Sequence, residues 1–155
     1  MISYRLRKKE MVFLLDFFGD INTLPQSFGN IYIDRQRYSE IAEDLNMKGI
    51  INLIDQTASA DTAVEVIFRS IYESSVVFTD ESLNIWCYCN QDIIILIRYD
   101  HIRKNEYIIT PLRTTDMLAE IIANEFGSSD FIMLRPSYRN IEYEKIYELL
   151  CGEDL

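Results

Sequence analysis

The chain has few of the residues that organise metal, redox or disulfide chemistry. Its 155 residues include one histidine, three cysteines, three prolines and five glycines. An odd number of cysteines is atypical of a secreted disulfide framework. The sequence has no Gly-rich phosphate loop, G-x-S-x-G, H-E-x-x-H or calcium-loop pattern. It therefore predicts no catalytic residue, no metal site and no cofactor, and so no enzyme.

Long hydrophobic runs are also absent. The apolar stretch 11–15 lies between Glu10 and Asp16, and no small-residue cleavage site follows it, which argues against a secretory signal. No segment approaches the ~20 continuous apolar residues of a membrane helix. These observations predict a cytoplasmic protein that does not insert into a membrane.

Acidic residues outnumber basic ones by 25 to 15, giving a formal net charge of −10. Such a surface repels phosphate backbones and anionic lipids, so we expect no nucleic-acid partner. The 48% apolar and 12% aromatic content is typical of a folded globular protein. The length fits one domain, covering residues 1–155.

Helical periodicity predicts three helices in the first half of the chain. The first covers residues 6–18 and ends at Gly19. The second covers 35–47, with Asp34 as its N-cap and Gly49 beyond its end. After a short apolar connector or strand at 49–54, a third helix begins near Asp61 and buries a stripe made of Val64, Ile67, Phe68 and Ile71.

From Val76 the apolar period changes from helical to alternating. Segments 76–80, 82–89, 92–99 and 106–112 predict a four-stranded antiparallel meander with short polar turns. The uninterrupted apolar run 93–97 predicts a strand covered on both faces. Thr114 or Thr115 can cap a further helix ending near Gly127, and a last helix begins near Ser137. The predicted class is α+β, with N-terminal helices, the sheet and then C-terminal helices.

Cys87 and Cys89 raise the question of a metal or redox site. Alternation places both on one face of a strand with Ile85, continuous with a hydrophobic row. Their Cα atoms would lie roughly 6.6 Å apart, near the limit for a disulfide. A zinc site would need two more ligands, for which only His101 and Cys151 remain. The pattern favours buried free thiols.

Other ionisable residues give no catalytic arrangement. His101 lies beside Asp100, but no serine or cysteine nearby is placed as a nucleophile, so an exposed turn residue is the simpler interpretation. The acidic residues near the C-terminus are interpreted as a solvated helix face; they are Glu142, Glu144, Glu148, Glu153 and Asp154.

Aromatic side chains exceed what one small core requires. Trp86 and Tyr88 lie on the strand face opposite the cysteines, and Phe13 and Phe17 widen the apolar stripe of the first helix. Two alternatives stay open: these residues form a partner-binding surface, or a second core layer beneath helices. Under the first alternative, the predicted partner-binding residues are Trp86, Tyr88, Phe13 and Phe17.

Several short segments resemble one family. They are "DFFGDINTLP" (16–25), "NMKGIINL" (46–53), and "IITPL" (108–112) leading into "TTDMLAEII" (114–122). With the order of elements, they resemble the EspG/EsaE-type cytosolic chaperones of type VII secretion systems. The mycobacterial members are longer and have two similar α+β halves, of which this chain could supply one. The resemblance implies a chaperone or adaptor that binds a secreted helical substrate or toxin and keeps it soluble for export.

Two other functions remain as alternatives. An immunity protein could neutralise a toxin by direct binding, for which a charge of −10 would suit a basic partner. An enzyme would have to use scattered carboxylates and His101. Self-association of the first helix into a homodimer is compatible with all three roles.

Overall fold

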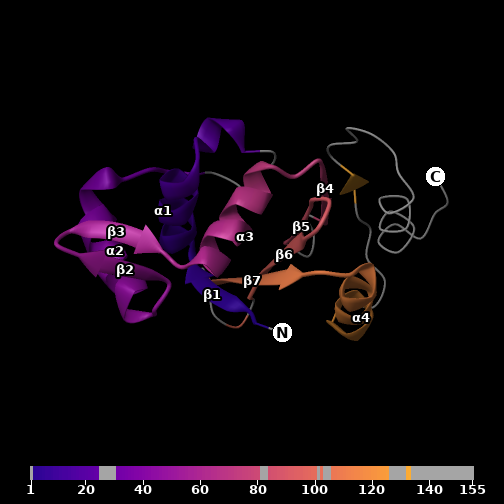
Figure 1. Cartoon of the computed structure of the whole chain (residues 1–155). Coiled ribbons are helices and arrows are strands. Elements are labelled where there is room, and N and C mark those ends of the chain that lie inside the picture. Colours follow the sequence, from indigo (N-terminus) through magenta and orange to yellow (C-terminus); the bar gives the residue numbers. More distant parts are fainter. Residues whose placement is uncertain are drawn as a thin grey trace.

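The structure is a computed structural model that describes residues 2–24, 31–80, 84–100, 102, 106–125 and 132–133. These residues form a mixed α+β structure, which confirms the predicted class. Four α-helices accompany one large and one small antiparallel sheet in the described residues (Figure 1).

The large sheet has six strands in the order β1-β7-β6-β5-β4-β8. The predicted meander is present as β4 (Val76–Asp80), β5 (Ile85–Cys89), β6 (Ile94–Tyr99) and β7 (Glu106–Leu112). The predicted total of four strands is wrong, because β1 (Tyr4–Arg7) pairs with β7 and β8 (Ile132–Met133) pairs with β4.

The N-terminal boundary also differs from the prediction. The first helix, α1 (Lys8–Phe18), begins two residues later than expected, because Leu6 and Arg7 belong to β1. Leu6 pairs with Tyr107 and is buried, whereas Arg5 is exposed. This alternation has the period of a strand. The apolar run that follows extended the predicted helix back over these residues.

The second helix and a hairpin extend away from the large sheet (Figure 1). A 3₁₀ turn (Arg35–Arg37) leads into α2 (Tyr38–Met47), and the Asp34 carboxylate accepts a hydrogen bond from the Gln36 backbone N–H. Gly49 has φ +75°, and Ile50 N–H donates to the Leu45 carbonyl. This is the Schellman ending that a glycine permits. Strands β2 (Ile51–Ile54) and β3 (Thr57–Ala60) then pair with each other.

Helices α1 and α3 (Thr62–Tyr72) cover one face of the large sheet, and α2 packs against α1 (Figure 1). The stripe predicted for α3 is buried as expected. Where α1 ends, Gly19 approaches α3 so closely that an added Cβ would lie 2.7 Å from the Tyr72 ring. The Tyr72 hydroxyl donates to the Leu15 carbonyl at 2.5 Å, which joins the two helices.

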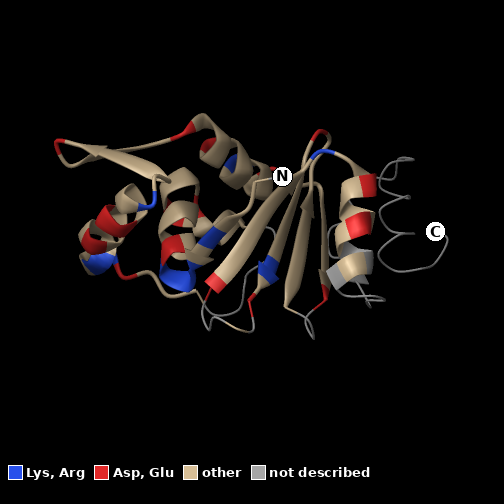
Figure 2. Ribbon diagram, turned by 90° about the horizontal axis from the view of Figure 1, so that it is seen from below, with Lys and Arg blue, Asp and Glu red and all other residues tan. Residues whose placement is uncertain are grey.

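The other face of the sheet is covered by α4 (Thr115–Glu125), which contributes Leu118 and Ile121 to the core there. The Thr114 hydroxyl accepts from the Met117 N–H at 3.2 Å, as expected for the residue that caps this helix. Residues 94–97 of β6 are buried between the two helix layers, which confirms the prediction for them, whereas Ile93 precedes the strand and is only partly buried. Figure 2 shows acidic residues along α4. The predicted last helix lies outside the described residues.

Among the described residues, no helix is both long and apolar enough to cross a membrane.

Candidate functional site

Three of the four residues predicted to bind a partner lie inside the core. Tyr88 is 0% exposed, Trp86 7% and Phe13 6%. The face that carries Trp86 and Tyr88 is covered by α1 and α3, so these side chains form the second core layer and not a surface. Burial raises the pKa of Tyr88 well above its usual value. Phe17 is 43% exposed and stacks near Phe13 at the outer side of α1.

The two strand cysteines are buried free thiols, as the sequence predicts. Their Sγ atoms lie 3.9 Å apart in the core beneath α4. Hydrogen bonding with Cys87 and burial raise the pKa of the Cys89 thiol, so the Cys89 sulfur is not poised as a nucleophile. Among the described residues, no group of three or more His, Cys, Asp and Glu side chains could hold a metal ion. His101, Cys151 and the C-terminal acidic residues lie outside the described residues.

Two hollows lie along α3 and together form a groove, the α3 groove. Its first half is apolar and has a volume of about 450 Å³. It is lined by Ile2, Tyr4, Thr62, Ala63, Val66, Ile67, Ile93, Pro111 and Arg113. Two of these apolar side chains are largely open to solvent, Ile2 at 69% and Val66 at 45% exposure.

The second half of the groove is polar and has a volume of about 510 Å³. Val66, Ile93 and Arg113 line both halves, so the two lie side by side. The remaining lining residues are Ser70, Glu73, Asn90, Gln91 and Asp92. Within the described residues, no ion pair includes Glu73, Asp92 or Arg113. The groove therefore carries two carboxylates and one guanidinium that form no ion pair with another described residue.

The register of the sheet explains how this groove is built. Tyr4 pairs with Ile109, and Ile95 pairs with Pro111. These pairings bring Ile2, Ile93 and Pro111 to one end of the sheet on the α3 side, although they are distant in sequence. From α3, the side chains at 63, 66, 70 and 73 recur at helical spacing and form the opposite wall.

A second cluster, around Glu10, ties helices together. The Glu10 side chain is 0% exposed, and its Oε1 accepts hydrogen bonds from Arg7 N, Arg7 Nε and Lys48 Nζ at 2.9, 3.2 and 2.7 Å. Burial by itself raises the pKa of Glu10, but the hydrogen bonds from Arg7 and Lys48 outweigh it and hold the pKa below its usual value. Arg7 also binds Asp44 at 2.7 Å. These contacts fasten the start of α1 to the end of α2, a structural role.

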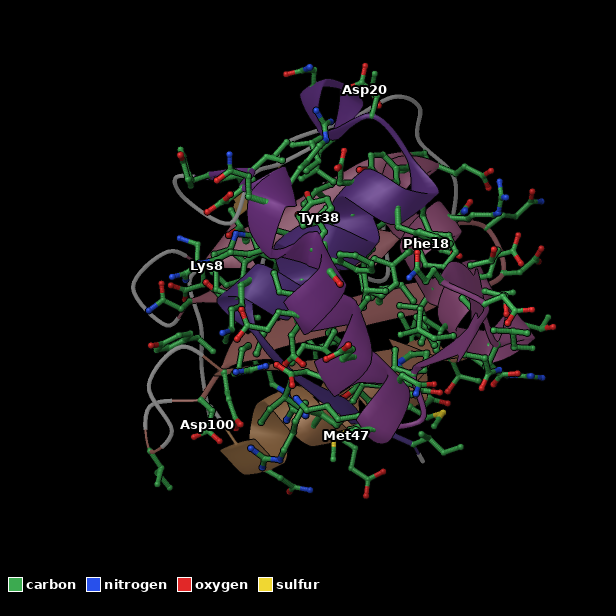
Figure 3. All side chains as sticks on the ribbon, turned by 90° about the vertical axis from the view of Figure 1, so that its left-hand side faces the viewer. Lys8, Phe18, Asp20, Tyr38, Met47 and Asp100 are labelled. Atoms are coloured by element: carbon green, nitrogen blue, oxygen red, sulfur yellow. The ribbon has the colours of Figure 1, made fainter. Side chains whose placement is uncertain are left out.

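A smaller hollow of about 210 Å³ lies between α1 and α2. Tyr38 lines it, and the Tyr38 hydroxyl donates to Asp16 at 2.9 Å. Burial and this contact raise the pKa of Tyr38 to about 12. Figure 3 shows Tyr38 on α2, with Met47 towards the opposite end of that helix. Tyr38 therefore stays a neutral hydrogen-bond donor at physiological pH.

Comparison with known proteins gives no further assignment, since neither a protein-family model nor a curated protein matches the chain.

Proposed function

We propose that this chain is a non-enzymatic, cytoplasmic binding protein that uses the α3 groove to hold a segment of a protein partner. By the family resemblance of its short segments, the partner is a secreted helical protein or toxin of a type VII secretion system. The chain would act as its chaperone or adaptor, covering an apolar surface until export. The binding step needs no cofactor.

The observation that carries this proposal is the exposure of apolar side chains in a groove. Ile2 and Val66 lie at two sides of the same hollow, and Ile67 and Pro111 extend its apolar lining. Burying one large aliphatic side chain contributes about 1.5–3 kcal/mol. Ile2 is 69% and Val66 45% exposed, so a partner segment that covers both gains that share of this free energy from each. Arg113, Glu73 and Asp92 are left to select its polar groups.

The test is affinity capture from native cytosol with three forms of the full chain. Wild type is compared with Val66→Asp in the groove and with Ile54→Asp at the end of β2. Ile54 is the matched control because it is also an exposed aliphatic residue, at 69%, and the hairpin lies on the other side of α1 from the meander (Figure 1). Each variant is first shown to be folded by circular dichroism and thermal unfolding.

The expected result is recovery of a secreted helical protein with wild type and Ile54→Asp, and its loss with Val66→Asp. Co-expression of that protein with wild type should also raise its soluble fraction, which is the property of a chaperone. Equal recovery with all three forms would contradict the proposal that the groove is the binding site. Recovery of nothing by wild type would contradict the binding function itself.

The net charge of −10 favours one second candidate, an immunity protein for a basic toxin. Association by charge slows steeply as ionic strength rises, whereas packing in an apolar groove does not. The capture is therefore repeated at low and high salt. A toxin that is lost at high salt would favour immunity, and a helical partner retained at high salt would favour the chaperone.

A further inference from the structure

The α3 groove is apolar in one half and polar in the other, and this difference says more about the partner than the function proposed above. Its apolar half lies at the N-terminal end of α3, around Ala63 and Val66, and its polar half reaches Glu73 at the C-terminal end. The hollow thus follows the length of α3, which is ~16 Å for a helix of its size. An occupant of the whole groove must therefore change from apolar to polar over about three helical turns.

We propose, resting on the function above, that the groove binds an amphipathic α-helix in one orientation. The apolar side chains of that helix lie against Ile2, Val66 and Ile93. A lysine or arginine at one end of it lies against Glu73 and Asp92.

A helix suits these walls better than an extended segment does. Most residues that line the apolar half are apolar, and Pro111 has no backbone N–H to offer. An extended segment would bring its own N–H and C=O groups against these walls, where they would lose water without gaining a partner. A helix satisfies those groups internally and presents only side chains, spaced to pack beside the side chains of α3.

Charge sets the orientation. Glu73 is the C-cap residue of α3, so its carboxylate lies where the helix dipole is already negative. Asp92 adds a second carboxylate to the same half of the groove. Arg113 lies at the junction of the halves and offsets one of these charges, so the polar half keeps a net negative charge. A cation of the partner is therefore favoured there and disfavoured at the apolar end.

The experiment selects ligands from a display library of random segments of about 15 residues, or roughly four helical turns. The library is panned on the folded full-length chain and counter-panned on Val66→Asp. The expected clones have aliphatic residues at i, i+3, i+4 and i+7 spacing and a lysine or arginine at one end. Ile2→Asp repeats the counter-selection on the opposite wall, and Ile54→Asp serves as the control.

One selected peptide then enters a charge-swap cycle with Glu73→Lys. Replacing the basic residue of the peptide by glutamate should weaken binding to wild type about tenfold, and the Glu73→Lys chain should restore it. Selection of extended sequences, no enrichment, or the absence of rescue would each overturn the inference. The proposed function is judged separately: if Val66→Asp abolishes capture of the native partner while the charge swap has no effect, the function stands and only the orientation fails.

Discussion

Replacing the buried Glu10 by glutamine should destabilise the fold by about 2–3 kcal/mol. The exchange keeps the shape of the side chain but removes the charge that three N–H groups share, and charge-assisted hydrogen bonds exceed neutral ones by roughly 1 kcal/mol. Arg7 and Lys48 are 36% and 37% exposed, so water recovers part of that loss. The new amide N–H would take the place of Oε2, which is already buried without a hydrogen-bond partner among the described residues, so the loss comes from the three weakened hydrogen bonds.

The assay is chemical denaturation of wild type and Glu10→Gln between pH 3 and pH 7. Because the folded-state pKa of Glu10 is lowered, its charge stabilises the fold fully above the unfolded value of about 4.3. This contribution is lost as the pH falls through the folded-state pKa. The difference between the two proteins should therefore be largest near neutral pH and should shrink below about pH 4.

Glu65→Gln is the matched control. Glu65 and Arg69 also form a 2.7 Å ion pair, but the side chains are 42% and 57% exposed, so this exchange should change the free energy of unfolding by less than about 0.5 kcal/mol. The reasoning would be refuted if Glu10→Gln and Glu65→Gln had equal effects, or if the effect of Glu10→Gln did not change with pH.

Three further changes test the described contacts. Gly49→Ala should lower the free energy of unfolding by about 1–2 kcal/mol, measured by chemical denaturation. The cause would be backbone strain at φ +75°, since an added Cβ meets nothing within 4 Å; an unchanged stability would contradict the Schellman ending. Tyr72→Phe should lower the free energy of unfolding by about 1 kcal/mol, because it removes the hydrogen bond from the Tyr72 hydroxyl to α1; an unchanged stability would argue against that hydrogen bond. Peptide-resolved alkylation should leave Cys87 and Cys89 unmodified in the folded chain and label both in denaturant; labelling in the folded state would contradict their burial.

The meander was predictable because its strands carry a strong local signal. Segments 76–80 and 106–112 match β4 and β7 at both ends, since alternating apolar residues bounded by polar turns leave few other structures. Strand β3 has no such signal. Its residues are small, and its turn uses Asp55 and Gln56 at positive φ instead of the Asn-Gly or Asp-Gly that usually marks such a hairpin.

The positions of the functional surfaces were less predictable than the strands. Alternation separates Trp86 and Tyr88 from the cysteines, but it does not say that α1 and α3 cover their face. Val66 offered one signal, because it is apolar yet lies outside the stripe that α3 buries. Its neighbours Ile2 and Pro111 join it only through the pairing of β1 with β7, a long-range register that local patterns do not encode.

Photo-crosslinking in living cells tests the α3 groove most directly. A photoreactive amino acid replaces Val66 in one strain and Ile54 in another, and the crosslinked peptides are identified by mass spectrometry. The account predicts a crosslink from position 66 to a helical segment of a secreted protein and none to that protein from position 54. A crosslink to such a partner from position 54 alone, or no crosslink from position 66, would contradict it.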